Sequence, residues 1–264
     1  MHQSFETVLL QVDGSVARLT LNRPDKGNAF DAGMHRDFPL ALSAIAANPD
    51  VRVILLTGAG RTFSGGGDFA YIRQLRSDAN LRAASFDESM AIFEHMTAAA
   101  VPIITVVHGH AMGVGATLVA LSDISVAWKD AKIADPHVQV GLVAGDGGAI
   151  AWSSAIGFNR AKRYLLTGEA LTGAQAYQLG LVTDLADTPE EALAMAEALA
   201  VRIAALSPLA VQGTKKAFNA LAAVRNGDAQ RLALEFEHVS LMSEDIEEAM
   251  TALAERRAGD FKGR

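Results

Sequence analysis

The chain has 264 residues, half of them hydrophobic, which suits one large domain with a sizeable core and at most a small appendage. Its formal net charge of −7 argues against nucleic acid as a partner, and the absence of cysteine excludes disulfides and thiolate chemistry. The N-terminus lacks the basic segment and apolar run of a signal peptide, and no apolar run reaches the ~18 residues of a membrane span, so we expect a cytoplasmic protein without a membrane partner.

The first half of the chain alternates strand and helix patterns. We expect, in chain order, a hairpin of strands 8–12 and 16–21, a loop at 24–28, a helix at 32–47, a buried strand at 51–56, a glycine-rich turn at 63–68, a helix at 81–99, a buried strand at 102–107, a second glycine-rich turn at 108–115, a helix at 116–121, and short strands at 124–128 and 132–134. This alternation predicts an α/β architecture.

Helical patterns dominate after Ala149. Thr188-Pro189-Glu190-Glu191 is a strong helix start, because it combines an N-cap residue, a first-turn proline and two acids. Ser207-Pro208 repeats that logic, and Ser243 opens a last helix that closes near Arg256. We therefore expect a C-terminal region built from helices.

The two glycine-rich turns each stand between a strand and a helix. Phe63-Ser-Gly-Gly-Gly-Asp68 lacks the ending of a P-loop, and Gly113-Val-Gly115 is too short for a dinucleotide fingerprint. Each could simply be a tight turn, with Asp68 as an N-cap. Together they could aim two backbone N–H groups at one developing oxyanion, where each donor is worth ~2.7–4 kcal/mol in a transition state.

His137 and Asp146 lie in a segment rich in glycine and short of charge. A histidine with a nearby carboxylate is a common arrangement for general acid–base catalysis near neutral pH. The alternatives are purely structural: a loop histidine that is hydrogen-bonded to a backbone carbonyl, and an aspartate that bonds its own backbone in a turn. The histidines lack the spacing of a metal site, so we expect no metal, and no serine stands in the Gly-x-Ser-x-Gly setting of a hydrolase.

An ordered series of segments resembles the enoyl-CoA hydratase/isomerase (crotonase) superfamily over nearly the whole chain. The segments are Leu21-Asn-Arg-Pro24 with Asn28-Ala29, Val53–Gly58, Phe63–Asp68, His108–Gly113, Ser122-Asp123-Ile124, Pro136 with Gly147-Gly148, Leu165–Gly168, Gly180-Leu181-Val182 and Glu255-Arg256-Arg257. The resemblance implies a crotonase-like spiral of ββα units over residues 1–200. It further implies a helical trimerisation region over residues 201–264, with self-association as a homotrimer or dimer of trimers.

The resemblance also implies an acyl-CoA ligand whose thioester carbonyl is held by the N–H groups of Gly67 and Val114. Coenzyme A would be part of the substrate, with no separate cofactor. The implied substrate- and CoA-binding residues are Lys26, Ala29, Gly65, Gly66, Asp68, Phe69, His110, Gly113, Thr117, Pro136, Leu142 and Arg256.

The chain departs from the family where hydratases place two glutamates, since Thr117 and His137 stand at those positions. A threonine is no general base at neutral pH without an activating partner. The His137–Asp146 pair is similar to that of the superfamily's β-diketone hydrolases, in which such a dyad activates water. Three hypotheses follow: an acyl-CoA enzyme of the hydratase/isomerase type in which this pair replaces the glutamates, a CoA-independent hydrolase that breaks a carbon–carbon bond, and a non-catalytic acyl-CoA-binding trimer.

Overall fold

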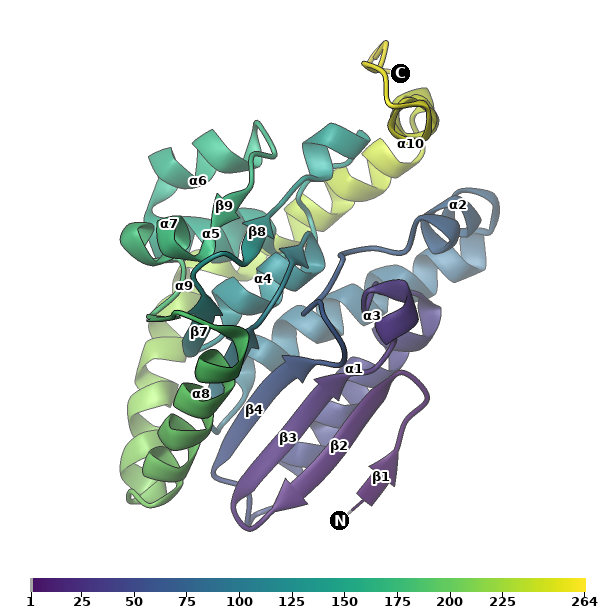
Figure 1. Ribbon diagram of the computed structural model, residues 1–264. Helices are drawn as coiled ribbons and strands as arrows, with labels where there is room; N and C mark the ends of the chain where they lie inside the picture. The colour runs from purple at the N-terminus through teal and green to yellow at the C-terminus, as the bar shows by residue number, and fades with distance from the viewer. Residues whose placement is uncertain (1) are drawn as a thin grey trace.

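A seven-stranded mixed sheet forms the centre of the computed structural model (Figure 1), which describes the backbone of residues 2–264 and the side chains of residues 5–221 and 228–264. Its strands, in the order they pair, are β1 (His2–Ser4), β2 (Val8–Asp13), β3 (Val16–Leu21), β4 (Val53–Gly58), β5 (Ile103–Val107), β7 (Ile124–Trp128) and β10 (Asp184–Ala186). The first three strands pair antiparallel, and every pairing from β3 to β10 is parallel. The predicted hairpin is confirmed: Asp13 pairs with Val16 across a two-residue loop, where Gly14 has a φ of +56°.

Alternate side chains of the parallel strands enter two different cores, as the pleat of a strand requires. Val53, Leu55 and Val106 pack against buried alanines of α8 (Pro189–Ala204). The intervening side chains, such as Ile54 and Leu56, pack into the larger core on the other face. Because both faces are covered, these strands are continuous apolar runs in the sequence.

The described chain up to Ile156 forms five α-helices: α1 (Ala32–Ala46), α2 (Phe69–Ser77), α3 (Ala79–Ala98), α4 (Val114–Leu121) and α5 (Gly148–Ile156). The sequence did not predict α2, which is a separate nine-residue helix. The side chain of Asp68 caps it by accepting hydrogen bonds from the backbone N–H groups of Ala70 and Tyr71. α4 begins two residues before its predicted start, so Val114 occupies its first turn.

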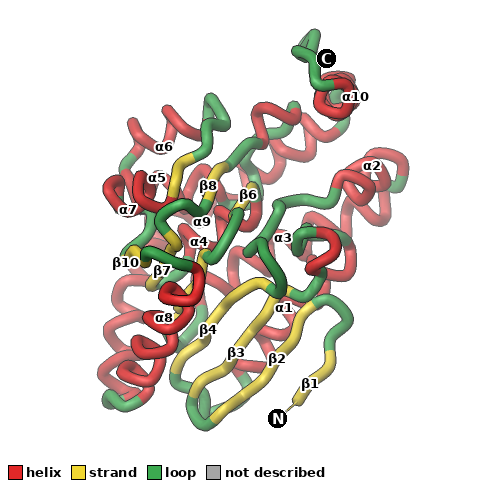
Figure 2. The backbone as a smooth tube through the Cα atoms, viewed as in Figure 1, coloured by secondary structure: helices red, strands yellow, loops and turns green. Residues whose placement is uncertain are grey.

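A second sheet of three short strands lies beside the first glycine-rich turn. It contains β6 (Ala111–Met112), β8 (Lys132–Ala134) and β9 (Leu171–Thr172), and Figure 2 shows loops on both sides of these strands. Ser64 also pairs with Ala111 in an isolated bridge. This pairing places the two glycine-rich turns next to each other.

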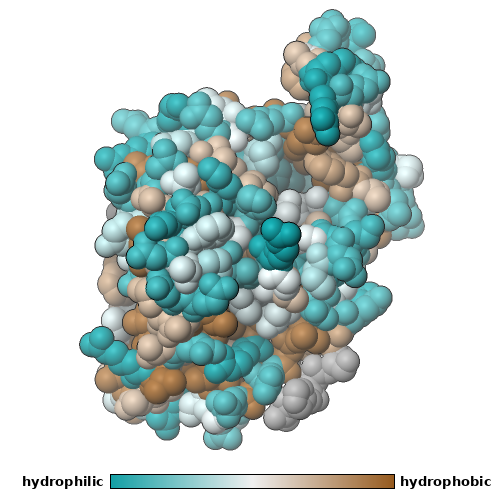
Figure 3. All heavy atoms as spheres, viewed as in Figure 1, coloured by the Kyte–Doolittle hydropathy of each residue, from teal (hydrophilic) through white to brown (hydrophobic). Residues whose placement is uncertain are grey.

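The rest of the chain is mainly helical, in agreement with the sequence. Its remaining helices are α6 (Phe158–Leu165), α7 (Gly173–Leu179), α9 (Pro208–Leu241) and α10 (Glu244–Glu255). The chain also forms two short 3-10 helices, η1 (Pro24–Lys26) and η2 (His137–Val140). The expected boundary after residue 200 falls within α8. α10 and the C-terminus project from the body (Figure 1), and apolar surface gathers at the base of this projection (Figure 3).

No single helix among the described residues is long and apolar enough to cross a membrane. α8 and the first part of α9, up to Leu221, meet the length and composition criteria only as a pair bent by 111°.

Candidate functional site

A cavity of about 120 Å³ lies between the two glycine-rich turns, η2 and the helices α1, α2, α3 and α9. Most of its wall is apolar, with Phe30, Ile72 and Leu234 among the lining side chains. The polar side chains that line it are His35, Tyr71, Ser85, Ser89, His137, Asp146, Glu237 and His238. An apolar pocket with a few convergent polar groups is the usual form of a small-molecule site.

The two glycine-rich turns present backbone N–H groups to this cavity. Ser64 ties them together, because its N–H donates to the carbonyl of His110 and its carbonyl accepts from Met112. The hydrogen bonds found among the described residues leave the N–H groups of Gly67 and Val114 without an acceptor, and both residues line the cavity. An N–H at the first turn of a helix such as α4 has no intrahelical partner. Two donors are therefore available side by side.

Glycine is required at Gly66, just before the first of these donors. Its φ of +90° is a backbone conformation that L side chains rarely adopt. A Cβ there would also lie 3.0 Å from the carbonyl oxygen of Met112 in the neighbouring turn. The close approach of the two turns, and hence of their N–H groups, depends on the missing side chain.

His137 lies between two carboxylates and next to the second glycine-rich turn, since a Cβ on Gly113 would be 3.3 Å from its Cε1. Its Nδ1 is in a very short contact with Oδ1 of Asp135, whose side chain is wholly buried. Its Nε2 lies 3.6 Å from Oδ2 of Asp146, an ion-pair distance beyond that of a hydrogen bond. Asp135, not the expected Asp146, therefore accepts the hydrogen bond that sets the orientation of the imidazole, and the sequence did not single out Asp135.

This arrangement alters the protonation of the group. Burial acts to lower the pKa of His137, but the carboxylates of Asp135 and Asp146 outweigh it and hold that pKa well above its ordinary value. Burial raises the pKa of Asp146, and the nearby imidazolium partly offsets the rise. A proton on the imidazole is therefore stabilised by the negative charge of both neighbouring carboxylates.

Glu237 of α9 brings a further carboxyl group to the same cavity. Burial, with the carboxylates of Asp146 and Asp135, raises its pKa to about 8, although His137 opposes the shift. Its Oε2 is buried, and no described residue forms a hydrogen bond with it. Glu237 is thus mostly a neutral acid near pH 7, a form that can give up a proton. No local sequence signal marks it, because it stands in a 34-residue helix with other charged residues.

Thr117 and Gly148 hold Asp146 in place. The hydroxyl of Thr117 donates to Oδ1 of Asp146 at 3.0 Å, and the N–H of Gly148 donates to the same oxygen at 3.3 Å. Asp146 therefore stabilises the local turn through its side chain and also lines the cavity. Ligand atoms of Asp135, His137 and Asp146 all lie within 4.8 Å of one another, a spacing that could hold a cation. The contact between Asp135 and Nδ1 already fills the space between two of them.

The structure brings most of the predicted site residues together. Besides His137, Asp146, Gly67 and Val114, the lining residues that were predicted are Gly65, Gly66, Phe69, Gly113, Pro136 and Leu142. Thr117 acts through Asp146, and Asp68 caps α2. The others do not line the cavity: Lys26 and His110 are exposed, Ala29 is half-buried, and Arg256 is exposed at the end of α10 with a φ of +54°.

The chain matches known proteins over nearly its whole length. The family model of the enoyl-CoA hydratase/isomerase family matches residues 11–264. The chain is 31% identical to a "probable enoyl-CoA hydratase" of Rhizobium meliloti over 261 residues, covering 99% of this chain and all of the relative. It is 32% identical to the "2,3-dehydroadipyl-CoA hydratase" of Escherichia coli over 253 residues, covering 94% and 96%. A crystal structure of an enoyl-CoA hydratase/isomerase from Mycobacterium paratuberculosis superposes with a TM-score of 0.88 at 38% identity, covering 94% of this chain and 99% of that one.

Proposed function

The chain belongs to the enoyl-CoA hydratase/isomerase family, and we propose that it adds water next to the carbonyl of an acyl-CoA thioester without the family's usual glutamate pair. One observation carries the proposal: a single cavity is lined by two N–H groups without acceptors and by a histidine between two carboxylates. The named relatives are enoyl-CoA hydratases, which are lyases, and we assign this enzyme to the same class.

The N–H groups of Gly67 and Val114 form the oxyanion hole in this mechanism. The thioester carbonyl accepts both hydrogen bonds, which strengthen as negative charge moves onto its oxygen. Fixed donors in a site with little water stabilise such charge without reorganising, and each is worth ~2.7–4 kcal/mol in the transition state.

The proton steps are divided between the His137–Asp146 pair and Glu237. When water attacks the β-carbon, the carboxylate of Asp146, beside the His137 imidazolium, takes one of its protons, and the electron pair of the double bond moves to the thioester as an enolate. Glu237, neutral near pH 7, then gives its proton to the α-carbon, and the pair returns a proton to Glu237. The product carries the hydroxyl at the β-carbon and the new hydrogen at the α-carbon, and the enzyme is restored.

Hydrolysis of a carbon–carbon bond in a β-diketone is the second candidate. The observation that favours it is the imidazole of His137, which is held by Asp135 and stands at a position where hydratases of the family place a glutamate. The same water would then attack a ketone carbonyl, and the leaving enolate would take the proton. This reaction needs no CoA, which separates the two candidates experimentally.

The test is a panel of trans-2-enoyl-CoA thioesters, followed by loss of the enoyl-thioester absorbance, beside cyclic β-diketones without CoA. We expect hydration of at least one thioester and a loss of ~100-fold or more in kcat for His137→Ala. The matched control is His95→Ala, since Nδ1 of His95 donates to the carbonyl of Pro39 and His95 does not line the cavity. Cleavage of diketones with no thioester turnover would replace the first candidate with the second, and undiminished turnover by His137→Ala would refute the role of the histidine. No turnover on either panel would support the non-catalytic acyl-CoA-binding reading.

A further inference from the structure

The hydroxyl of Tyr71 is buried in the cavity wall, and the described side chains give it no hydrogen bond of normal geometry, although Ser85 is close enough to act on its pKa. Only 4% of the residue is exposed. A buried donor without a partner costs ~1–3 kcal/mol, so native structures keep few of them. The proton steps proposed above do not use this hydroxyl. It therefore requires an explanation of its own.

His35 stands beside Tyr71 on the same wall, with ring centroids 5.5 Å apart. Its Nδ1 lies 2.9 Å from the carbonyl oxygen of Asp31. Because a carbonyl only accepts, Nδ1 carries the hydrogen. Burial lowers the pKa of His35, so the ring is neutral near pH 7 and its Nε2 is an acceptor. The hydrogen bonds found for the described side chains do not use that Nε2.

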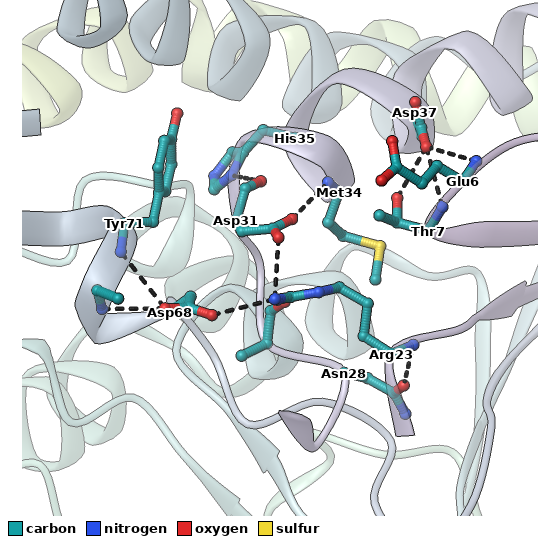
Figure 4. A network of polar contacts seen from close by, with 12 residues as sticks. Glu6, Thr7, Arg23, Asn28, Asp31, Met34, His35, Asp37, Asp68 and Tyr71 are labelled. Carbon is teal, nitrogen blue, oxygen red and sulfur yellow. Dashed lines mark hydrogen bonds and ion pairs between the residues drawn. The ribbon is translucent and has the colours of Figure 1, made fainter. Parts of the chain in front are cut away.

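An ion-pair network fixes the two rings relative to each other (Figure 4). Nη2 of Arg23 lies 2.9 Å from Asp31 and 3.2 Å from Asp68. Those aspartates are the N-caps of α1 and α2, the helices that carry His35 and Tyr71. Both rings are therefore anchored within one turn or so of a capped helix start, and the donor and acceptor are organised before any ligand binds.

We propose that Tyr71 and His35 recognise a hydroxyl group on the acyl part of the substrate. A hydroxyl can accept from the phenol of Tyr71 and donate to Nε2 of His35, whereas a ketone oxygen could only accept. This inference rests on the proposed function, since it places the acyl group in the same cavity as the thioester carbonyl.

The size of the cavity limits the acyl group. A cavity of ~150 Å³ in another protein holds one benzene molecule, and this one measures about 120 Å³. Phe30, Ile72 and Leu75 make the surrounding wall apolar. The group that fits is compact, of about the size of one aromatic ring, and carries its hydroxyl within reach of Tyr71 and His35.

The experiment is calorimetric titration of wild type and Tyr71→Phe with benzoyl-CoA, 3-hydroxybenzoyl-CoA and 4-hydroxybenzoyl-CoA. We expect at least one hydroxylated thioester to bind wild type about ten-fold or more tightly than benzoyl-CoA. Tyr71→Phe should lose this difference and keep its affinity for benzoyl-CoA. Tyr177→Phe, which removes an exposed phenol on α7, is the matched control and should behave as wild type.

Two results would overturn the inference: hydroxylated thioesters that bind no more tightly than benzoyl-CoA, or a difference that survives in Tyr71→Phe. If none of the thioesters binds, the proposed function has failed, and a second pair of probes decides the inference separately. Phenol and toluene need no CoA site. Tighter binding of phenol than of toluene by wild type, lost in Tyr71→Phe, would support the hydroxyl site, and equal binding would refute it.

Discussion

Replacing Glu237 with glutamine should make the stability of the protein less sensitive to pH. The pKa of Glu237 is raised to about 8 in the folded state, from 4.5 for the free side chain, because the carboxyl is buried near two other carboxylates. Glutamine has nearly the same shape but does not ionise. The comparison of the two proteins therefore isolates the cost of keeping this carboxyl group in the cavity.

The sign follows from the direction of the shift. Because the folded pKa lies above the unfolded one, the stability linked to Glu237 is fully present below pH 4.5 and is lost as the pH rises toward about 8. Each pH unit in that window is worth ~1.4 kcal/mol, so wild type loses on the order of 3 kcal/mol of unfolding free energy between pH 4.5 and pH 7 through this group. Glu237→Gln escapes that loss.

Urea unfolding followed by tryptophan fluorescence, from about pH 5 to about pH 8, measures the effect. The free energy of unfolding of Glu237→Gln minus that of wild type should grow by ~1 kcal/mol per pH unit over this range. Glu235→Gln is the control, because Glu235 is an exposed carboxyl on the same helix. Parallel pH dependence of wild type and Glu237→Gln would refute the claim that the buried carboxyl is neutral near pH 7.

Two further changes test the support of the site and of the core. Gly148→Ala places a Cβ 2.1 Å from Oδ2 of Asp135, so the buried carboxylate must move. We expect kcat to fall ~100-fold in steady-state assays. An unchanged kcat would contradict the orienting role of Asp135. Lys215→Met removes the buried ammonium that donates to Asp123 at 2.6 Å and to the carbonyl of Val101. Urea titration should show that the free energy of unfolding falls by ~2 kcal/mol, less than for a fully buried pair because the Asp123 side chain is 30% exposed. An unchanged midpoint would show that this ion pair contributes nothing to stability.

Local patterns in the sequence predicted most of the secondary structure. The hairpin at Gly14 and the helix starting at Pro189 depend on residues within a few positions of one another, and both are confirmed. The helix α2 was missed because it is only nine residues long, although Asp68 was considered as an N-cap. The two glycine-rich turns and His137 were recognised from their residue types.

The sequence by itself thus determined the α/β class, the family resemblance and the segments from which the cavity is built. Only the tertiary structure decided which side chains meet there. Asp135 accepts from His137, Glu237 is a neutral acid near pH 7, and the hydroxyl of Tyr71 has no hydrogen bond of normal geometry among the described side chains. These properties depend on burial and on charges that packing brings together. Residue type and spacing along the chain carry no measure of either, since desolvation and Coulomb interactions are set by distance in space.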